Sequence, residues 1–342
     1  MMKICIYGAG AIGCYIGGRL RASGSHVSLI GRARIGDELR QHGLSLSDYR
    51  GQRWHVEPNA IVFATDVSAA QDADLVLVTV KSAATAAAAA ELADVLKPNA
   101  IVISFQNGLS NTDVLHRALP HHTVLEGMVP FNVVHDGHTF HQGSEGELEV
   151  REHAGLYAFL ADFKRAGLPL IEHFDMLPIQ WAKLLLNLNN SINALANLPL
   201  KTELSQLDYR RCLALAQREA LTLLRAAKIE PAKLTPIPAH WIPRLLNVPD
   251  LLFTRLGAKM LTIDPQARSS MSDDLAAGRM TEVDWINGEV VRLAQQLGRE
   301  APVNARLIEL IHRAERSEIR PSWKGSELLA ELLIAGPGTD RL

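Results

Sequence analysis

The chain has 342 residues, of which 47% are hydrophobic and 21% are charged, and its formal net charge at neutral pH is −2. This composition is typical of a folded globular protein. The length exceeds the size at which a single core usually stops growing, so we expect two domains. The balanced charge excludes a broad attraction for nucleic acid or an anionic membrane, and no apolar run is long enough to span a bilayer. Any anionic ligand must therefore be held by a small local site.

Three cysteines, Cys5, Cys14 and Cys212, are scattered along the chain. They lack the close pairs that are typical of metal ligands, and their odd number argues against a disulfide framework. We therefore expect no metal site and a reducing compartment, which we take to be the cytoplasm.

The first segment, KICIYGAGAIG, begins with a β-branched run and continues with three glycines in G-x-G-x-x-G spacing. In a dinucleotide site the first glycine allows a tight turn, the second lets a pyrophosphate approach the backbone, and the third lets the following helix pack closely on the strand. A helical pattern and a second strand, HVSLI, complete the unit. The alternative is a purely structural glycine turn. The predicted cofactor turn comprises Gly8, Ala9, Gly10, Ala11, Ile12 and Gly13.

The end of the second strand bears on which nicotinamide cofactor is bound. An NAD site usually has Asp or Glu here, but the sequence reads SLIGRAR and places Arg32 at or next to this position, with Arg34 close by. A guanidinium pairs with a 2′-phosphate, whereas a carboxylate would repel it. We therefore expect NADP(H), the alternative being a solvated basic loop.

Strand and helix patterns alternate up to about residue 172. Strands are expected at IVFAT, ADLVLVTVK, AIVISF, HTVLEGMVPFNVV and GELEV, with an alanine-rich helix and a helix from about Asn111 between them. This alternation predicts a mostly parallel, doubly wound α/β domain of Rossmann type over residues 1–172. Lys81 and the turn Gln106–Gly108 follow two of these strands, where ligands bind in such sheets. Each could equally be an ordinary polar strand end.

Helical patterns dominate residues 173–342 and predict an all-α second domain. Its proline-rich stretch TPIPAHWIPRLLNVP is expected to be an irregular connection. The helix that starts at WAKLLLNLNN carries Lys183, Asn187, Asn190 and Ser191 on one face, with apolar residues around most of the rest. This stripe faces either solvent or a wet cleft. In a cleft, desolvation would move the pKa of Lys183 toward neutrality and make it a better proton donor.

The block SSMSDDLAAGRMTEVDWINGEVV has a simple structural interpretation. Ser269 and Ser270 are candidate caps for a short helix, and Glu282 stands in the first turn of a longer one, where the helix dipole favours a carboxylate.

Taken in chain order, these motifs resemble the ketopantoate reductase (2-dehydropantoate 2-reductase) family over nearly the whole chain. They are GAGAIG, the lysine after DLVLVTV, FQNG, the W-x-K-L-x-x-N helix and the SSMSDD block. The resemblance implies an NADPH-binding Rossmann domain, a helical domain, and a 2-oxo acid held in the cleft between them. It implies that Lys183 is the general acid that protonates the carbonyl oxygen, and that Glu282 holds the substrate hydroxyl and helps position the lysine.

The same resemblance assigns the remaining site residues. Ser191 stands where the family commonly has a second asparagine, eight residues after the lysine, and we place it in the substrate wall. The residues assigned to the substrate are Asn107, Asn187, Ser191 and Ser270, and those assigned to the cofactor are Gly8, Ala9, Gly10, Ala11, Ile12, Gly13, Arg32, Lys81 and Asn107.

Two departures bear on the substrate more than on the reaction: the serine at position 191, and a segment over residues 228–269 that looks longer than in compact members. We expect reduction of 2-dehydropantoate to pantoate, a step toward pantothenate and coenzyme A. The alternatives are the same chemistry on another 2-oxo acid, or an NADP-sensing protein without catalysis. The presence of both Lys183 and Glu282 argues against the sensor. A homodimer is compatible with the sequence.

Overall fold

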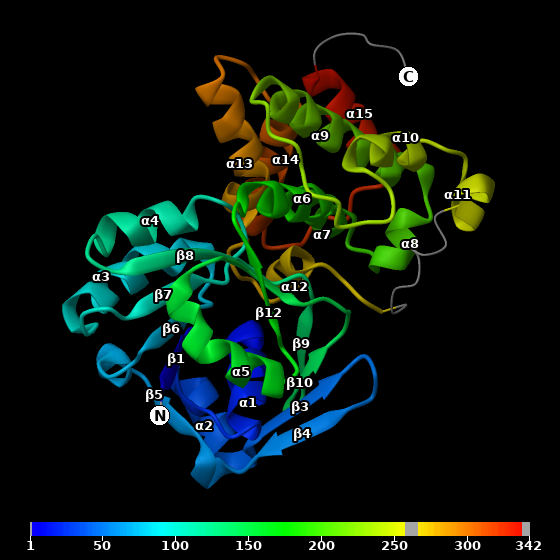
Figure 1. The fold of residues 1–342 in the computed structure, drawn as a ribbon. Helices are drawn as coiled ribbons and strands as arrows, with labels where there is room; N and C mark the ends of the chain where they lie inside the picture. The colour runs from blue at the N-terminus through cyan, green and yellow to red at the C-terminus, as the bar shows by residue number, and fades with distance from the viewer. Residues whose placement is uncertain (1, 257–265, 337–342) are drawn as a thin grey trace. The chain divides into compact units, whose positions relative to one another are not determined.

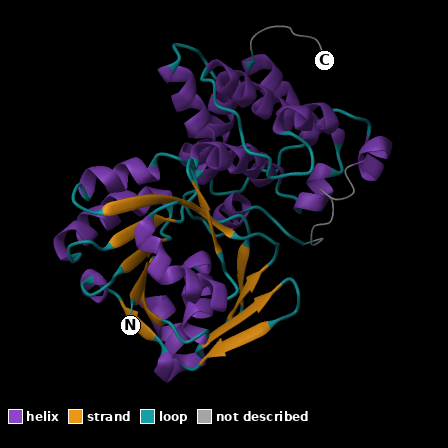
Figure 2. Ribbon diagram, in the orientation of Figure 1, coloured by secondary structure: helices purple, strands orange, loops and turns teal. Residues whose placement is uncertain are grey.

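The chain divides into two compact units, Met1–Met176 and Leu177–Leu342, whereas the sequence places the boundary at residues 172/173. The structure, a computed structural model, describes residues 2–256 and 266–336. All strands of the described residues belong to the first unit, and the second consists of helices and their connections (Figures 1 and 2). The expected fold class, α/β followed by all-α, is confirmed. None of the described helices is both long and apolar enough to cross a membrane.

The main sheet of the first unit has eight strands in the order β12-β11-β8-β7-β6-β1-β2-β5. Neighbouring strands are parallel except for β8 and β11. The chain runs from β1 to β2 and β5 and then returns to the other side of β1 with β6, so the strand order reverses there. In doubly wound sheets ligands bind at this point of reversal, outside the carboxyl ends of the strands. The strands are β1 Lys3–Tyr7, β2 His26–Ile30, β5 Val62–Ala64, β6 Leu75–Val78, β7 Ile101–Ser104, β8 Thr123–Met128, β11 Leu148–Arg151 and β12 Leu170–His173.

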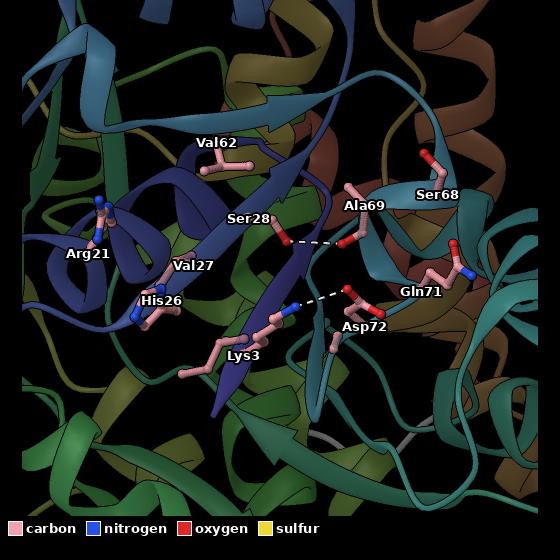
Figure 3. A pocket seen from close by; sticks show the side chains of 12 residues that line it. Lys3, Arg21, His26, Val27, Ser28, Val62, Ser68, Ala69, Gln71 and Asp72 are labelled. Carbon is pink, nitrogen blue, oxygen red and sulfur yellow. Dashed lines mark hydrogen bonds and ion pairs between the residues drawn. The ribbon is translucent and has the colours of Figure 1, made fainter. Parts of the chain in front are cut away.

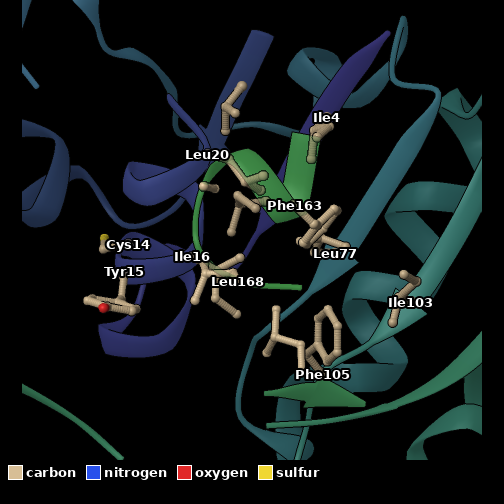
Figure 4. Packing of buried hydrophobic residues seen from close by; sticks show 14 of the residues in the cluster. Ile4, Cys14, Tyr15, Ile16, Leu20, Leu77, Ile103, Phe105, Phe163 and Leu168 are labelled. Atoms are coloured by element: carbon tan, nitrogen blue, oxygen red, sulfur yellow. The ribbon is translucent and has the colours of Figure 1, made fainter. Parts of the chain in front are cut away.

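Helices bury both faces of this sheet. Ile4 and Ile6 of β1 pack into a core with α1 (Ala11–Ala22), α2 (Ala33–His42) and α5 (Tyr157–Arg165). Figure 4 shows Ile4, Leu77 and Ile103 in the same group as Ile16 and Leu20 of α1 and Phe163 of α5. The alternate side chains of β1, Cys5 and Tyr7, pack into a second core with α3 (Thr85–Val95) and α4 (Asn111–Ala118). Burial on both faces explains the nearly continuous apolar strands.

A second sheet of four short strands, in the order β4-β3-β10-β9, was not expected from the sequence. Its strand β10 is parallel to β3, and the other pairs are antiparallel. The expected strand region HTVLEGMVPFNVV is divided between β8 of the main sheet and β9 of this one. The bounds are β3 Leu44–Asp48, β4 Arg53–Val56, β9 Val133–Asp136 and β10 Thr139–Gln142.

The 20-residue helix α9 packs against several helices of the second unit. The proline-rich stretch, residues 235–249, is not irregular throughout, because a 3₁₀ turn and α10 form within it and α11 begins directly after it. Pro243 stands in the first turn of α10, where the N–H that proline lacks would have no intrahelical partner. The helices are α6 Leu177–Asn187, α7 Asn189–Ala196, α8 Leu200–Leu204, α9 Leu207–Ala226, α10 Ile242–Leu246, α11 Asp250–Leu256, α12 Ser270–Ala276, α13 Val283–Gln296, α14 Pro302–Glu315 and α15 Gly325–Ala335.

Arg210 of α9 binds the chain segments around α8, α10 and the start of α11 through hydrogen bonds and an ion pair. Its guanidinium is fully buried and donates to the carbonyl oxygens of Leu204, Leu246 and Val248 at 3.0, 3.2 and 2.8 Å. It also pairs with Asp250 at 2.8 Å. A buried guanidinium needs such partners, so this one side chain links α8, α10 and the start of α11 to α9.

Candidate functional site

The three glycines of the first turn have three different environments. Gly8 has a φ of +120°, and a Cβ there would lie 2.6 Å from the amide nitrogen of Val80. A Cβ at Gly13 would lie 2.2 Å from the carbonyl oxygen of Gly8, so only glycine lets α1 pack this closely. A Cβ at Gly10 would meet nothing within 4 Å. The first and third positions are thus confined by the protein, and the second faces open space.

The start of α1 offers its backbone N–H groups to an anion. Gly10 is the N-cap and has no side chain to bond them, and the first turn contains no acidic residue. The N-terminal end of a 12-residue helix carries a partial positive charge and unsatisfied N–H donors. The geometry suits a phosphate group at this point.

Arg32 lies at the carboxyl end of β2, one residue beyond Gly31. It is the N-cap residue of α2, its side chain makes no capping hydrogen bond, and it is exposed. Arg34, also exposed, lies two residues along in the first turn of α2. The strand β2 lies next to β1, which leads into the glycine turn. An exposed guanidinium at the end of β2 therefore suits a second phosphate of a ligand whose first phosphate lies at the start of α1.

Lys81 and Asn107 follow β6 and β7, and hydrogen bonds join their two loops. Gln106 Nε2 donates to the carbonyl oxygen of Val80 at 2.9 Å, and Ser82 Oγ donates to that of Asn107 at 3.2 Å. Lys81 is exposed and Asn107 is half-buried. The sheet order β7-β6-β1-β2 therefore brings the predicted cofactor residues together at the carboxyl ends of four adjacent strands.

A pocket of about 330 Å³ lies at the opposite edge of the sheet, where β1 and β2 begin (Figure 3). Lys3 and His26 line it, and Lys3 Nζ pairs with Asp72 at 2.9 Å. None of the predicted site residues lines this pocket. Its lysine is already paired, and ligands of doubly wound sheets bind at the other edge, so we assign it no role in the site.

Residues 181–196 of the second unit are mostly buried, and most of the predicted polar stripe belongs to the part that remains accessible. Lys183, Leu186, Asn187 and Asn190 are half-buried, and the other residues between 181 and 196 are buried. Burial lowers the pKa of Lys183 to about 8. The amine thus keeps some accessible surface while protein surrounds it closely enough to desolvate it, which favours an enclosed position over one in bulk water.

Ser191 does not share this accessibility. It has no exposed surface, and its hydroxyl donates to the carbonyl oxygen of Leu188 at 3.2 Å. The expected single helix is interrupted at Leu188 into α6 and α7. A serine that bonds a carbonyl in the preceding turn competes with the backbone ladder, and this bond lies at the interruption.

Ser270 does not perform the capping role that the sequence allows, and Glu282 stands at the N-terminal end of its helix, where the dipole favours a carboxylate, without capping it. Glu282 is the buried N-cap residue of α13, but its side chain makes no capping hydrogen bond, and Thr281 Oγ1 accepts from Val283 N at 3.3 Å instead. Ser269, rather than Ser270, caps α12 by accepting from Ser272 N at 3.2 Å. Ser270 is exposed. The carboxyl of Glu282 and the hydroxyl of Ser270 are therefore not required as caps.

A second, fully internal set of amides was not found from the sequence. Asn189 and Asn193 are buried, and both donate to Oε2 of the buried Glu203, each at 3.1 Å. Their separation by four residues was the signal in the sequence, since it places both on one helix face. Their acceptor could not be identified, because Glu203 lies on another helix.

The fold, the predicted cofactor residues of the first unit and the polar stripe around Lys183 in the second unit together define the class of protein. A doubly wound sheet with this glycine turn is a dinucleotide-binding unit, and a helical unit with a desolvated lysine follows it. Two family models match the chain, ketopantoate reductase PanE/ApbA over residues 4–155 and its C-terminal part over residues 175–315. The chain belongs to the ketopantoate reductase PanE/ApbA family, whose members are oxidoreductases acting on CH–OH groups.

Relatives agree with this membership over most of their length. The chain is 28% identical to a 2-dehydropantoate 2-reductase of Halobacterium salinarum, with 92% of this chain and 99% of the relative covered. A crystal structure of a PanE/ApbA family ketopantoate reductase from Ralstonia eutropha is 29% identical, with a TM-score of 0.78 and coverage of 92% and 98%. A structure of D-mandelate dehydrogenase with NADH and anilino(oxo)acetate shares the fold at 22% identity, with a TM-score of 0.75 and coverage of 92% and 98%.

Proposed function

We propose that the protein reduces 2-dehydropantoate to pantoate with NADPH. The observation that carries this proposal is the half-buried Lys183, whose pKa burial lowers to about 8 on the only accessible stripe of residues 181–196. An amine with this pKa is largely protonated at neutral pH and is still acidic enough to release its proton readily. Family membership supports the same reaction type.

In the proposed reaction Lys183 is the general acid. When bound, the reduced nicotinamide supplies the hydride that forms the new C–H bond. The carbonyl electron pair moves onto oxygen, and the ammonium of Lys183 stabilises the developing charge and donates the proton of the new hydroxyl. Solvent then reprotonates the amine. Glu282 would accept a hydrogen bond from the substrate hydroxyl and help to position the lysine.

The proposed substrate contacts come from Asn107, Asn187 and Ser270, whose side chains are half-buried or exposed. Ser191 is proposed with them, and its buried hydroxyl would reach a ligand only after a change of rotamer. The glycine turn, Gly8 to Gly13, would hold the pyrophosphate. Arg32 and Lys81 would bind near the 2′-phosphate, which supports NADPH over NADH.

The experiment that tests the function is a panel of 2-oxo acids, assayed for loss of NADPH and NADH absorbance. We expect 2-dehydropantoate with NADPH to have the highest kcat/KM. A higher value for another 2-oxo acid would favour the second candidate, the same chemistry on a different substrate. The buried Ser191, at a position where the family motif has asparagine, is the observation behind that candidate. No turnover with any acid, but tight NADPH binding, would favour a sensor.

A further inference from the structure

Glu203 of α8 is a buried carboxyl group whose partners are amides. It has no exposed surface, and its Oε2 accepts from Asn189 Nδ2 and from Asn193 Nδ2. Its other oxygen, Oε1, has no hydrogen-bond partner among the described residues. A charged carboxylate is costly in such surroundings, and burial raises the pKa of Glu203 to about 8. The group is therefore mainly neutral at physiological pH.

Asn193 is oriented by this carboxyl. Its Nδ2 faces two acceptors, Glu203 Oε2 at 3.1 Å and the carbonyl oxygen of Leu198 at 3.0 Å. Its Oδ1 accepts from the backbone N–H of Ser269 at 3.0 Å. A flipped amide would oppose oxygen to both acceptors and N–H to N–H. Glu203 and Leu198 together thus determine that an oxygen faces Ser269.

The segment that begins α12 depends on this contact. Ser269 Oγ also donates to the carbonyl oxygen of Asn190 at 3.3 Å, and Leu200 N donates to that of Ala267 at 2.9 Å. The helix α12 has only seven residues, and helices this short are not stable by themselves. Tertiary hydrogen bonds therefore set the position of its first residue, Ser270.

We propose that Glu203 is a positioning residue for substrate binding, acting through Asn193 to hold Ser270 in place. The inference rests on the proposed function, in which Ser270 binds the 2-oxo acid. Glu203 itself touches neither substrate nor cofactor. Its removal should consequently weaken the binding of the 2-oxo acid more than it slows the chemistry.

Glu203→Leu in the full chain is the principal test, because leucine keeps apolar volume and removes the acceptor. We expect the KM for the 2-oxo acid to rise about 10-fold, with kcat and the KM for NADPH within about 2-fold. In a Ser270→Ala background the same substitution should change that KM by less than about 2-fold. Glu203→Gln retains an acceptor oxygen and should restore most of the affinity.

Glu219 offers a matched control. It is a half-buried carboxyl of α9 that accepts from Val303 N at 3.0 Å and Asn304 N at 2.9 Å, at the start of α14. Any effect of Glu219→Leu on kcat/KM should be the same with and without Ser270. Equal effects of Glu203→Leu in both backgrounds, or no effect at all, would overturn the proposal. Should that variant not fold, Asn193→Ala takes its place in the same cycle.

Hydrogen exchange separates this inference from the proposed function. In Glu203→Leu the backbone amide of Ser269 should exchange about 10-fold faster or more, while amides in the middle of α9 exchange as before. This measurement needs no substrate. If no 2-oxo acid is reduced, the proposed function fails by itself, and exchange decides the position of the segment. Unchanged exchange at Ser269 would contradict the role of Glu203.

Discussion

Lys183 has a consequence for the pH dependence of the reaction. Only the protonated amine can act as the acid, and burial lowers its pKa to about 8. We therefore expect kcat/KM to be level below about pH 8 and to fall above it, as the ammonium is lost. Steady-state rates from pH 6 to pH 10, measured with a saturating reduced cofactor, check this. A profile that stays level to pH 10 would contradict an acid with this pKa.

Removal of the same amine gives a second result. Lys183→Ala should lower turnover by about 10²–10⁴-fold and leave NADPH binding nearly unchanged, because the glycine turn belongs to the other unit. Single-turnover rates and calorimetric titration with NADPH measure the two effects. Undiminished turnover would remove Lys183 as the general acid.

The choice of cofactor is tested at Arg32. If Arg32 pairs with the 2′-phosphate as proposed, Arg32→Ala removes a charge-assisted pair, so the Kd for NADPH should rise roughly 10-fold or more while that for NADH changes little. Arg34→Ala is the matched control, since Arg34 is also exposed in the same loop-to-helix region. An equal loss for both cofactors, or a larger effect of Arg34, would refute the assignment.

At the scale of elements, the start of α1 predicts opposite results for two neighbouring glycines. A Cβ at Gly13 would lie 2.2 Å from Gly8 O, so Gly13→Ala forces the helix from the strand and should lower stability by about 1–3 kcal/mol. A Cβ at Gly10 meets nothing within 4 Å, so Gly10→Ala should fold normally and weaken NADPH binding. Thermal unfolding and cofactor titration of both variants decide it. Tight NADPH binding by Gly10→Ala would show that no pyrophosphate lies there.

Elements built from local patterns could be predicted, and those that depend on distant partners could not. The apolar strands and the glycine turn of the main sheet are local signals. The second sheet pairs Ser45 of β3 with Thr139 of β10, and these short strands lie far apart in the chain. Likewise the stripe that contains Lys183 follows from helical periodicity. The bond from Asn193 to Glu203 requires knowing how two helices pack.

At the scale of the molecule, Glu203 links stability to pH. Its carboxyl has a pKa of about 8 when folded, above the ordinary value of 4.5. Between these two pH values the carboxyl is protonated in the folded state and ionised in the unfolded state. Its contribution to the free energy of unfolding is therefore fully present below pH 4.5 and is lost as the pH rises to about 8. Glu203→Gln removes the dependence. Relative to wild type, the variant should gain on the order of 2 kcal/mol between pH 5.5 and pH 8.

Chemical denaturation of both proteins at the two pH values measures this difference. Because the chain has two units, the transition of the helical unit should be followed separately. A difference that does not change with pH would mean that Glu203 is ionised in the folded state throughout this range.

The reactivity of the three thiols can report separately how often each unit opens. Cys5 lies on β1, Cys14 on α1 and Cys212 on α9, all unpaired and buried, and burial raises the pKa of each, to about 11 for Cys5. A neutral thiol without access to solvent reacts slowly with alkylating reagents. Labelling therefore reports how often the surrounding structure opens, and mass spectrometry of the labelled peptides distinguishes the nucleotide-binding unit from the helical one without any engineered probe.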